Sequence, residues 1–143
     1  MKKKSNMIFL CSRYRGDTET NLKNERKYAR LIAKCGYPVV APHLLYTQFL
    51  NDSDAAERIE GIKLGIESMK LCSQIWIFGT SISDGMKFEI EKAKELDIEA
   101  VLFDEDGNTI DPATLKIDDR IDSHYRQIVN GLKFRVLGGY GYV

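Results

Sequence analysis

The feature that most constrains the fold of this chain is an unbroken apolar run over residues 75–78, directly after Gln74. Continuous apolar runs of this kind are typical of strands that are covered on both faces, as in parallel sheets. Short apolar segments at residues 7–11, 37–41 and 100–103 predict three further strands. Each strand needs helices on both of its faces, so the rest of the chain has to supply them.

Helical spacing of apolar residues separates these strands and predicts helices over residues 18–34, 54–71, 84–96 and 120–130. Residues 132–143 are expected to hold a final strand and a tail. The expected buried face of the second helix consists of Ala55, Ile59, Ile62, Ile66 and Met69.

Alternating strands and helices predict an α/β fold. We expect a small doubly wound parallel sheet of four to five strands, flavodoxin-like or Rossmann-like, with helices on both faces. The length predicts a single domain over residues 1–143, with residues 1–6 and 138–143 as flexible tails.

Composition argues against several kinds of partner. Lys plus Arg and Asp plus Glu number 21 each, so the net charge is zero and a nucleic-acid partner is not expected. No apolar run approaches the length of about 18 residues that spans a membrane. The widely spaced Cys11, Cys35 and Cys72 fit neither a zinc pattern nor a disulfide framework, which indicates a reducing cytoplasm. We expect no metal and no cofactor.

Loops that follow parallel strands meet at one edge of a sheet, next to helix N-termini, where α/β proteins bind ligands. The candidate substrate-binding residues are Ser12, Arg13, Tyr14, Arg15, Gly16 and Asp17 after the first strand, His43 after the second, and Gly79, Ser83, Asp84, Gly85 and Met86 after the third. Two arginines and a glycine suit a phosphate or carboxylate. The first loop is neither a Walker A loop nor a G-x-G-x-x-G fingerprint, so triphosphate or nicotinamide binding is not indicated.

Glu89 is the candidate catalytic residue. On a helical wheel it lies in the same arc as Met86, Ile90 and Ala93, so it faces the protein. A half-buried carboxylate beside a helix N-terminus can act as a nucleophile or general base. The simpler alternative is that Glu89 only complements the helix dipole. Arg58 could pair with Glu89 or form a surface salt bridge.

Three groups of residues together resemble a known family. They are Tyr14-Arg15-Gly16-Asp17 with Asn21, Ala41-Pro42-His43-Leu44 with Gln48-Phe49-Leu50, and Trp76-Ile77-Phe78-Gly79 with Ser83 and Gly85-Met86-Lys87-Phe88-Glu89-Ile90. The chain resembles the nucleoside 2-deoxyribosyltransferase-like superfamily. It is most similar to its DUF4406 branch, which is associated with phages and mobile elements and has no known function.

The resemblance implies a specific chemistry. In active relatives the Glu of a G-x-x-x-E pattern, here Gly85 to Glu89, attacks the sugar C1 and displaces the base; a second base or water then resolves the glycosyl-enzyme. The first loop, here Arg13, Arg15 and Gly16, binds a 5′-phosphate. The resemblance implies a nucleotide or nucleoside ligand, deoxyribosyltransferase or N-glycosidase activity, and a homo-oligomer with sites near subunit interfaces.

Two departures from the family leave other functions open. Phe9 stands where active relatives carry a Tyr that positions the Glu, and Ser73 stands where they often carry an Asp. One alternative is a non-catalytic protein that binds or sequesters a nucleotide-derived signal, for example in phage counter-defence. Another is a protein–protein adaptor that uses Tyr46 and Phe49. The tail, residues 138–142, could supply an aromatic side chain to a neighbouring subunit or simply be frayed.

Overall fold

One sheet organises the protein. The computed structural model describes residues 5–135, in which six strands pair in the order β2-β1-β3-β4-β5, with β6 also pairing with β4. The strands are β1 (Ile8–Cys11), β2 (Val39–Val40), β3 (Gln74–Phe78), β4 (Glu99–Phe103), β5 (Thr109–Ile110) and β6 (Lys133–Phe134). Every pairing is parallel except that of β4 with β5. The predicted α/β fold with a mostly parallel sheet is therefore confirmed.

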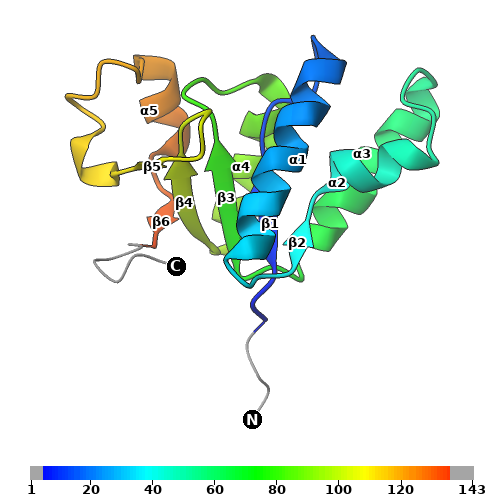
Figure 1. Ribbon diagram of the computed structural model, residues 1–143, viewed down its shortest axis with the longest axis horizontal. Coiled ribbons are helices and arrows are strands. Elements are labelled where there is room, and N and C mark those ends of the chain that lie inside the picture. Colours follow the sequence, from blue (N-terminus) through cyan, green and yellow to red (C-terminus); the bar gives the residue numbers. More distant parts are fainter. Residues whose placement is uncertain (1–4, 136–143) are drawn as a thin grey trace.

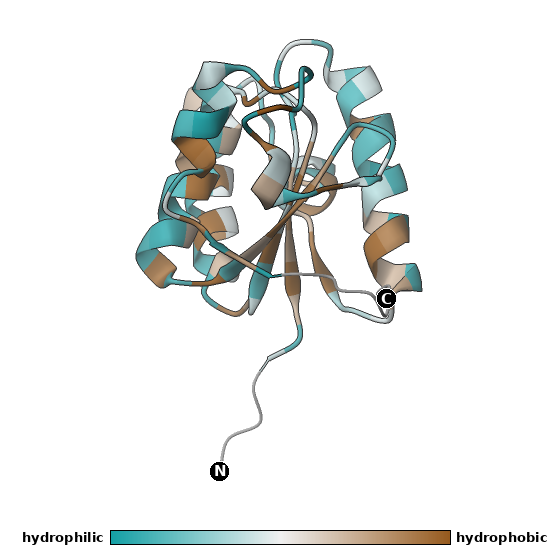
Figure 2. Ribbon diagram, turned by 90° about the vertical axis from the view of Figure 1, so that its left-hand side faces the viewer, coloured by the Kyte–Doolittle hydropathy of each residue, from teal (hydrophilic) through white to brown (hydrophobic). Residues whose placement is uncertain are grey.

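Helices cover both faces of this sheet (Figure 1). They are α1 (Thr18–Lys34), α2 (Pro42–Leu45), α3 (Ala55–Met69), α4 (Asp84–Leu96) and α5 (Ser123–Val129), with short 3₁₀ helices at Tyr46–Gln48 and Pro112–Thr114. Seen edge-on, the hydrophobic strands lie between helical layers whose outer surfaces are mainly hydrophilic (Figure 2). Within residues 5–135, no helix combines the length and apolar character needed to cross a lipid bilayer.

Alternate residues of each strand enter two separate cores, as the pleat of a strand requires. Ile8 and Leu10 of β1 pack on the α1 side with Tyr28 and Ile32. Their neighbours Phe9 and Cys11 face the opposite side, where residues of α3, α4 and α5 complete the larger core. Both faces of β3 are buried, which explains why its sequence is continuously apolar.

The structure corrects several details of the sequence prediction. On α3, Met69 is buried, but Ala55 is exposed, Ile59 is 50% exposed and Ile62 48% exposed, so the expected apolar face is only partly covered. The connection after β2, for which no element was predicted, forms α2 and a 3₁₀ turn. Pro42 lies so close to α3 that a Cβ on Gly65 would be 3.0 Å from its Cβ.

Helix α5 begins at Ser123 instead of residue 120, because the Asp122 side chain caps it by accepting a 2.8 Å hydrogen bond from the Tyr125 amide. The two-residue strand β5 had no apolar run to predict it. The proposed tail at residues 138–143 lies outside the described residues, as do residues 1–4 of the other predicted tail.

Candidate active site

A cavity of about 720 Å³ lies where the strand order changes direction, between β1 and β3. This is the usual ligand position in doubly wound sheets, and the volume is that of a small-molecule site. Its walls are the loop after β1, helices α2 and α3, and the N-terminal half of α4. The predicted residues that line it are Ser12, Arg13, Tyr14, Arg15, Gly16, His43, Ser83, Asp84, Gly85, Met86 and Glu89.

Two predicted residues lie elsewhere. Asp17 is exposed and caps α1, with its carboxylate accepting a 3.2 Å hydrogen bond from the Thr20 amide. Gly79 borders a smaller hollow of about 90 Å³ on the other side of Arg13. Gly16 adopts a φ of +101°, in the left-handed region, which lets the chain turn from β1 into α1 beside the cavity.

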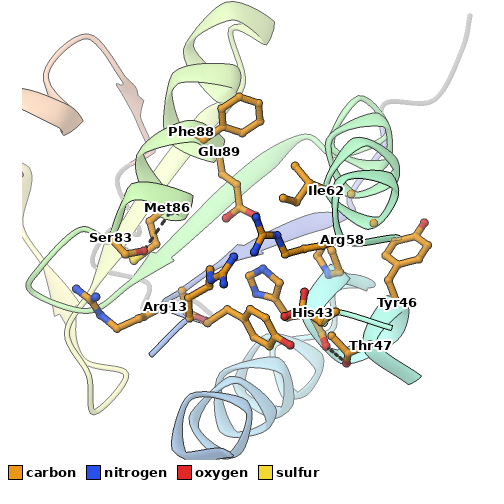
Figure 3. Close-up of a pocket in the computed structure, with 18 of the residues that line it drawn as sticks. Arg13, His43, Tyr46, Thr47, Arg58, Ile62, Ser83, Met86, Phe88 and Glu89 are labelled. Carbon is orange, nitrogen blue, oxygen red and sulfur yellow. Dashed lines mark hydrogen bonds between the residues drawn. The ribbon is translucent and has the colours of Figure 1, made fainter. Parts of the chain in front are cut away.

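Glu89 extends from α4 into the cavity (Figure 3). The residue as a whole is only partly buried, but its Oε1 is shielded from solvent and has no hydrogen-bond partner within residues 5–135. Burial raises the pKa of this carboxyl to about 7, with a further increase from the negative charge of Glu25. The charge of His43 and the Cys11 thiol oppose that rise. Glu91 and Glu95, by contrast, are exposed, as the helical wheel predicts.

Across the cavity, His43 lies between an aromatic ring and a buried carboxylate. Its imidazole stacks on Tyr14 at a centroid distance of 4.4 Å and an interplanar angle of 19°. Its Nδ1 is 3.3 Å from Oε1 of Glu25, whose side chain is 0% exposed. Burial alone would lower the pKa of His43, but Glu25, helped by Glu89 and Asp52, raises it above its ordinary value.

The arginine-bearing loop forms one rim of the cavity. Arg13 donates a 3.1 Å hydrogen bond to Ser81, whereas Arg15 has no carboxylate within ion-pair distance among residues 5–135. On the facing rim, Ser83 caps α4 by accepting a 3.3 Å hydrogen bond from the Met86 amide. The positive end of the α4 dipole therefore also faces this space, and an anion could be bound between the two rims.

The wall formed by α3 supplies both charge and apolar surface. Arg58 reaches into the cavity near Glu89 (Figure 3), although no ion pair joins the two in the described chain. Its Nε is buried without a partner there. Ile62 of α3 and Phe88 of α4 flank the opening and are about half exposed. Such a surface suits a flat, partly apolar ring.

The two departures from the resembled family lie in distinct places. Phe9 is fully buried in the core beneath α4. Because its side chain has no hydroxyl, this position cannot donate a hydrogen bond to Glu89. The Ser73 hydroxyl donates to the Met7 carbonyl at 3.4 Å and does not line the cavity. Within residues 5–135, no cluster of three or more His, Cys, Asp and Glu side chains is placed to hold a metal ion.

Glu25 is a buried residue beside this site that the sequence analysis missed, and Asp52, Ile62 and Phe88 line the cavity without having been predicted as site residues. Glu25 lies on α1 between Leu22 and Tyr28, at three-residue spacing from each, and so faces inward with them. The signal was the same as for Glu89, a single carboxylate within an apolar helix face. Only the folded chain shows that its partner is His43, which comes from a different element.

Comparisons with known proteins agree with the fold. Residues 6–103 match a family described as a domain of unknown function, DUF7768, whose label differs from that of the DUF4406 branch, so the latter stays a prediction. No curated protein gives a match. The fold is similar to a solved 2-deoxyribosyltransferase from the psychrotolerant bacterium Bacillus psychrosaccharolyticus, with a TM-score of 0.59 and 20% identity. That match covers 87% of this chain and 90% of the other.

Proposed function

We propose that this chain, which belongs to the DUF7768 family, binds a nucleoside or nucleotide and cleaves its N-glycosidic bond with Glu89 as the nucleophile. The observation that carries the proposal is an unpaired, buried carboxyl oxygen in a cavity with an arginine-bearing rim. Unpaired buried carboxylates are costly, so their presence in a cavity favours a chemical role over a structural one. The fold that the chain shares with a 2-deoxyribosyltransferase supports the same chemistry by analogy.

The reaction has two steps. The Glu89 carboxylate attacks the anomeric carbon, and the C–N bond breaks with its electron pair going to the base, which takes up a proton. The resulting glycosyl ester is then attacked by water or by a second base, and the C–O bond breaks with its electrons returning to Glu89. With a pKa of about 7, Glu89 is available in its ionised form at neutral pH.

The surrounding residues have separable roles in this proposal. Arg15, Gly16 and the N-terminus of α4 bind the 5′-phosphate of a nucleotide. Arg15 supplies a positive charge that no carboxylate within residues 5–135 pairs with, and the positive end of the α4 dipole adds to it. Ile62 and Phe88 contact the base at the opening. The proposed site thus holds the phosphate and the base on opposite sides of Glu89.

The test is release of free base from a library of nucleosides and nucleotides, measured by mass spectrometry. Wild type should release a base, and Glu89→Gln should lower the rate about 10³-fold or more, since it removes the nucleophile while keeping the shape. Glu91→Gln, on the exposed side of the same helix, is the matched control and should keep the wild-type rate. Equal rates for wild type and Glu89→Gln would exclude Glu89 as the nucleophile.

A second candidate function is a non-catalytic protein that binds or sequesters a nucleotide-derived signal, as in phage counter-defence. The observation that favours it is Phe9, which leaves no strand hydroxyl beside Glu89. In this case the cavity would retain an intact nucleotide, and Glu89→Gln would not change its chemical fate. Recovery of the unchanged ligand after prolonged incubation with wild type would favour this function.

A homo-oligomer with sites near subunit interfaces is part of the first proposal. The observation behind it is exposed apolar surface around the cavity, at Ile59, Ile62 and Phe88. A second subunit over this surface would bury it and close the opening. Light scattering coupled to gel filtration tests this, and a monomer at all concentrations would contradict it.

A further inference from the structure

Glu25 is a buried charged residue that the proposed mechanism does not use. Its side chain is 0% exposed on α1, and neither carboxylate oxygen has a well-directed hydrogen bond within residues 5–135. A helix such as α1 normally turns its acidic residues to solvent, as it does with Glu19. Burial of a carboxylate is costly unless a positive charge compensates it. The nearest candidate is His43, with Nδ1 at 3.3 Å from Oε1.

We propose that Glu25 is a positioning residue that keeps Nδ1 of His43 protonated and fixes the ring, so that Nε2 of His43 exchanges protons with a ligand beside Glu89. This inference rests on the proposed function and extends it to the source of the proton that the departing base needs.

The geometry restricts the imidazole on one face and at Nδ1. Tyr14 stacks on one face of the ring at 4.4 Å, and Glu25 approaches Nδ1 from α1. The Nδ1 atom is buried, whereas the His43 side chain as a whole keeps 26% of its surface exposed and lines the cavity. A ring nitrogen that faces a carboxylate carries the proton, which sets the tautomer and leaves the other nitrogen for the ligand.

The charges around His43 favour its protonated form. Carboxylates approach from three elements: Glu25 on α1, Glu89 on α4 and Asp52 in the loop before α3. Arg15 and Arg58 also line the cavity and oppose them. The three carboxylates outweigh burial, because the pKa of His43 is raised in spite of it.

This arrangement completes the proton balance of both steps. As the C–N bond breaks, Nε2–H of His43 passes its proton to the base, and the electron pair of the N–H bond stays on Nε2. The ring is then neutral, with its remaining proton on Nδ1 towards Glu25. In the second step Nε2 takes a proton from the attacking water, whose oxygen forms the bond to the anomeric carbon as the ester to Glu89 breaks. His43 is thereby returned to its starting state.

The electrostatic interaction between His43 and Glu89 also favours a protonated His43. The positive charge of His43 lowers the pKa of Glu89 and thus favours the ionised nucleophile. The negative charge of Glu89 raises the pKa of His43 and thus favours the proton donor. The reactive combination, an ionised Glu89 with a protonated His43, is therefore stabilised by the interaction of its own members.

The test is an NMR titration of the imidazole nitrogens of the full chain, which has only two histidines. Glu25→Gln removes the charge but keeps the size, so the pKa of His43 should fall by about one to three units. His124, exposed on α5, is the internal control, and its NMR signals should be the same in both proteins. An unchanged His43 titration in Glu25→Gln would overturn the proposal.

A measurement on wild type alone covers the case in which Glu25→Gln fails to fold. At a pH where His43 is neutral, its nitrogen shifts should show the proton on Nδ1. A proton on Nε2 would contradict the proposal without any variant. Neither NMR measurement needs a substrate, so both can be interpreted even if the protein shows no glycosidic activity.

The kinetic readout separates positioning from a purely structural role. If wild type releases base, Glu25→Gln should lower kcat about ten- to a hundredfold with little change in KM, because the proton donor is lost while the binding surface is kept. The alkaline limb of the pH–rate profile should move to lower pH, following the pKa of His43. A profile of unchanged shape in a folded Glu25→Gln would mean that Glu25 only supports the structure.

Discussion

Glu89 and Asp104 both follow strands of one sheet, at the edge where its parallel strands end, but the fold treats the two carboxylates differently. Asp104 comes directly after β4 and accepts 2.9 Å hydrogen bonds from the amides of Asp106 and Asn108 and from Nη1 of Arg120. Burial alone would raise its pKa, but these donors hold it below its ordinary value. Glu89 has a buried oxygen without a partner, and its pKa is raised.

The difference shows how a structural carboxylate can be told from a candidate catalytic one. Asp104 is used internally, because its oxygens hold a turn and an arginine in place. Glu89 holds nothing in place within the described chain and opens onto a cavity. At Glu89 the fold tolerates the cost of an unpaired buried oxygen beside a cavity, where a ligand could make use of it.

The largest expected effect is on how stability depends on pH. The folded pKa of Glu89 is raised from 4.5 to about 7, so the folded state binds more protons than the unfolded state in that range. The free energy of unfolding of wild type, minus that of Glu89→Gln, should therefore fall by roughly 2–3 kcal/mol as the pH rises through that window. Urea unfolding at several pH values measures it.

Asp104 should show the opposite dependence. Its folded pKa is depressed, so its contribution is present above its ordinary value of 3.8 and is lost as the pH falls below it. The difference between wild type and Asp104→Asn should therefore shrink in acid. If the free energy of unfolding, relative to wild type, changed with pH in the same direction for Glu89→Gln and for Asp104→Asn, the two carboxylates would not differ in the way described.

The second effect concerns stability at neutral pH. Asp104→Asn should lower the free energy of unfolding by about 1–3 kcal/mol, because the amide cannot accept all three hydrogen bonds and leaves Nη1 of Arg120 without its acceptor. Glu89→Gln should not lower it, since no hydrogen bond to the buried oxygen is lost. Thermal and urea unfolding at one pH compare the two directly. Destabilisation by Glu89→Gln as large as that by Asp104→Asn would show that Glu89 is structural.

The third effect compares two arginines. Arg120 binds Asp104 and Asp118, whereas Arg15 has no carboxylate partner within residues 5–135. Arg15→Ala should therefore weaken binding of a nucleoside 5′-phosphate about tenfold, with little effect on the unphosphorylated nucleoside or on stability. Arg120→Ala should destabilise the fold without changing affinity. Calorimetry with both ligands measures this, and equal losses for nucleoside and nucleotide would place the phosphate elsewhere.

The smallest effect is at the opening of the cavity. Phe88→Ala removes an apolar contact for the base and should weaken nucleoside binding about threefold to tenfold. Ile117→Ala is the control, because Ile117 is 83% exposed and lies away from the cavity. The same affinity for both variants would mean that the base does not contact Phe88.

Sequence reasoning succeeded where a pattern is local. The apolar run of β3 predicts a strand covered on both faces, and helical spacing places Glu89 on the inner side of α4. Both features follow from periodicity, which depends only on the residues of the element itself.

It failed where the outcome depends on what packs against an element. Ile59 and Ile62 have the spacing of buried residues on a helix, but both are about half exposed. The face of α3 that carries them is not fully covered by another element within residues 5–135, and Ile62 lines the cavity. Glu25 could have been noticed on its helix, but its contact with His43 joins residues 18 positions apart on two elements. The short strand β5, which no apolar run predicts, pairs with an edge that β4 offers it, whereas β6 lies within the final strand expected over residues 132–143.

The most direct test of the central claim is covalent trapping with a nucleoside whose sugar carries fluorine at C2. The fluorine destabilises the oxocarbenium-like transition states of both steps, and the glycosyl-enzyme accumulates where its formation stays faster than its hydrolysis. The account predicts that the mass of wild type increases by that of the fluorinated sugar, and that peptide mapping places the adduct on Glu89. Glu89→Gln should stay unmodified, and Glu91→Gln should be modified like wild type. An adduct on another residue, or turnover of the parent nucleoside by Glu89→Gln at the wild-type rate, would contradict the claim.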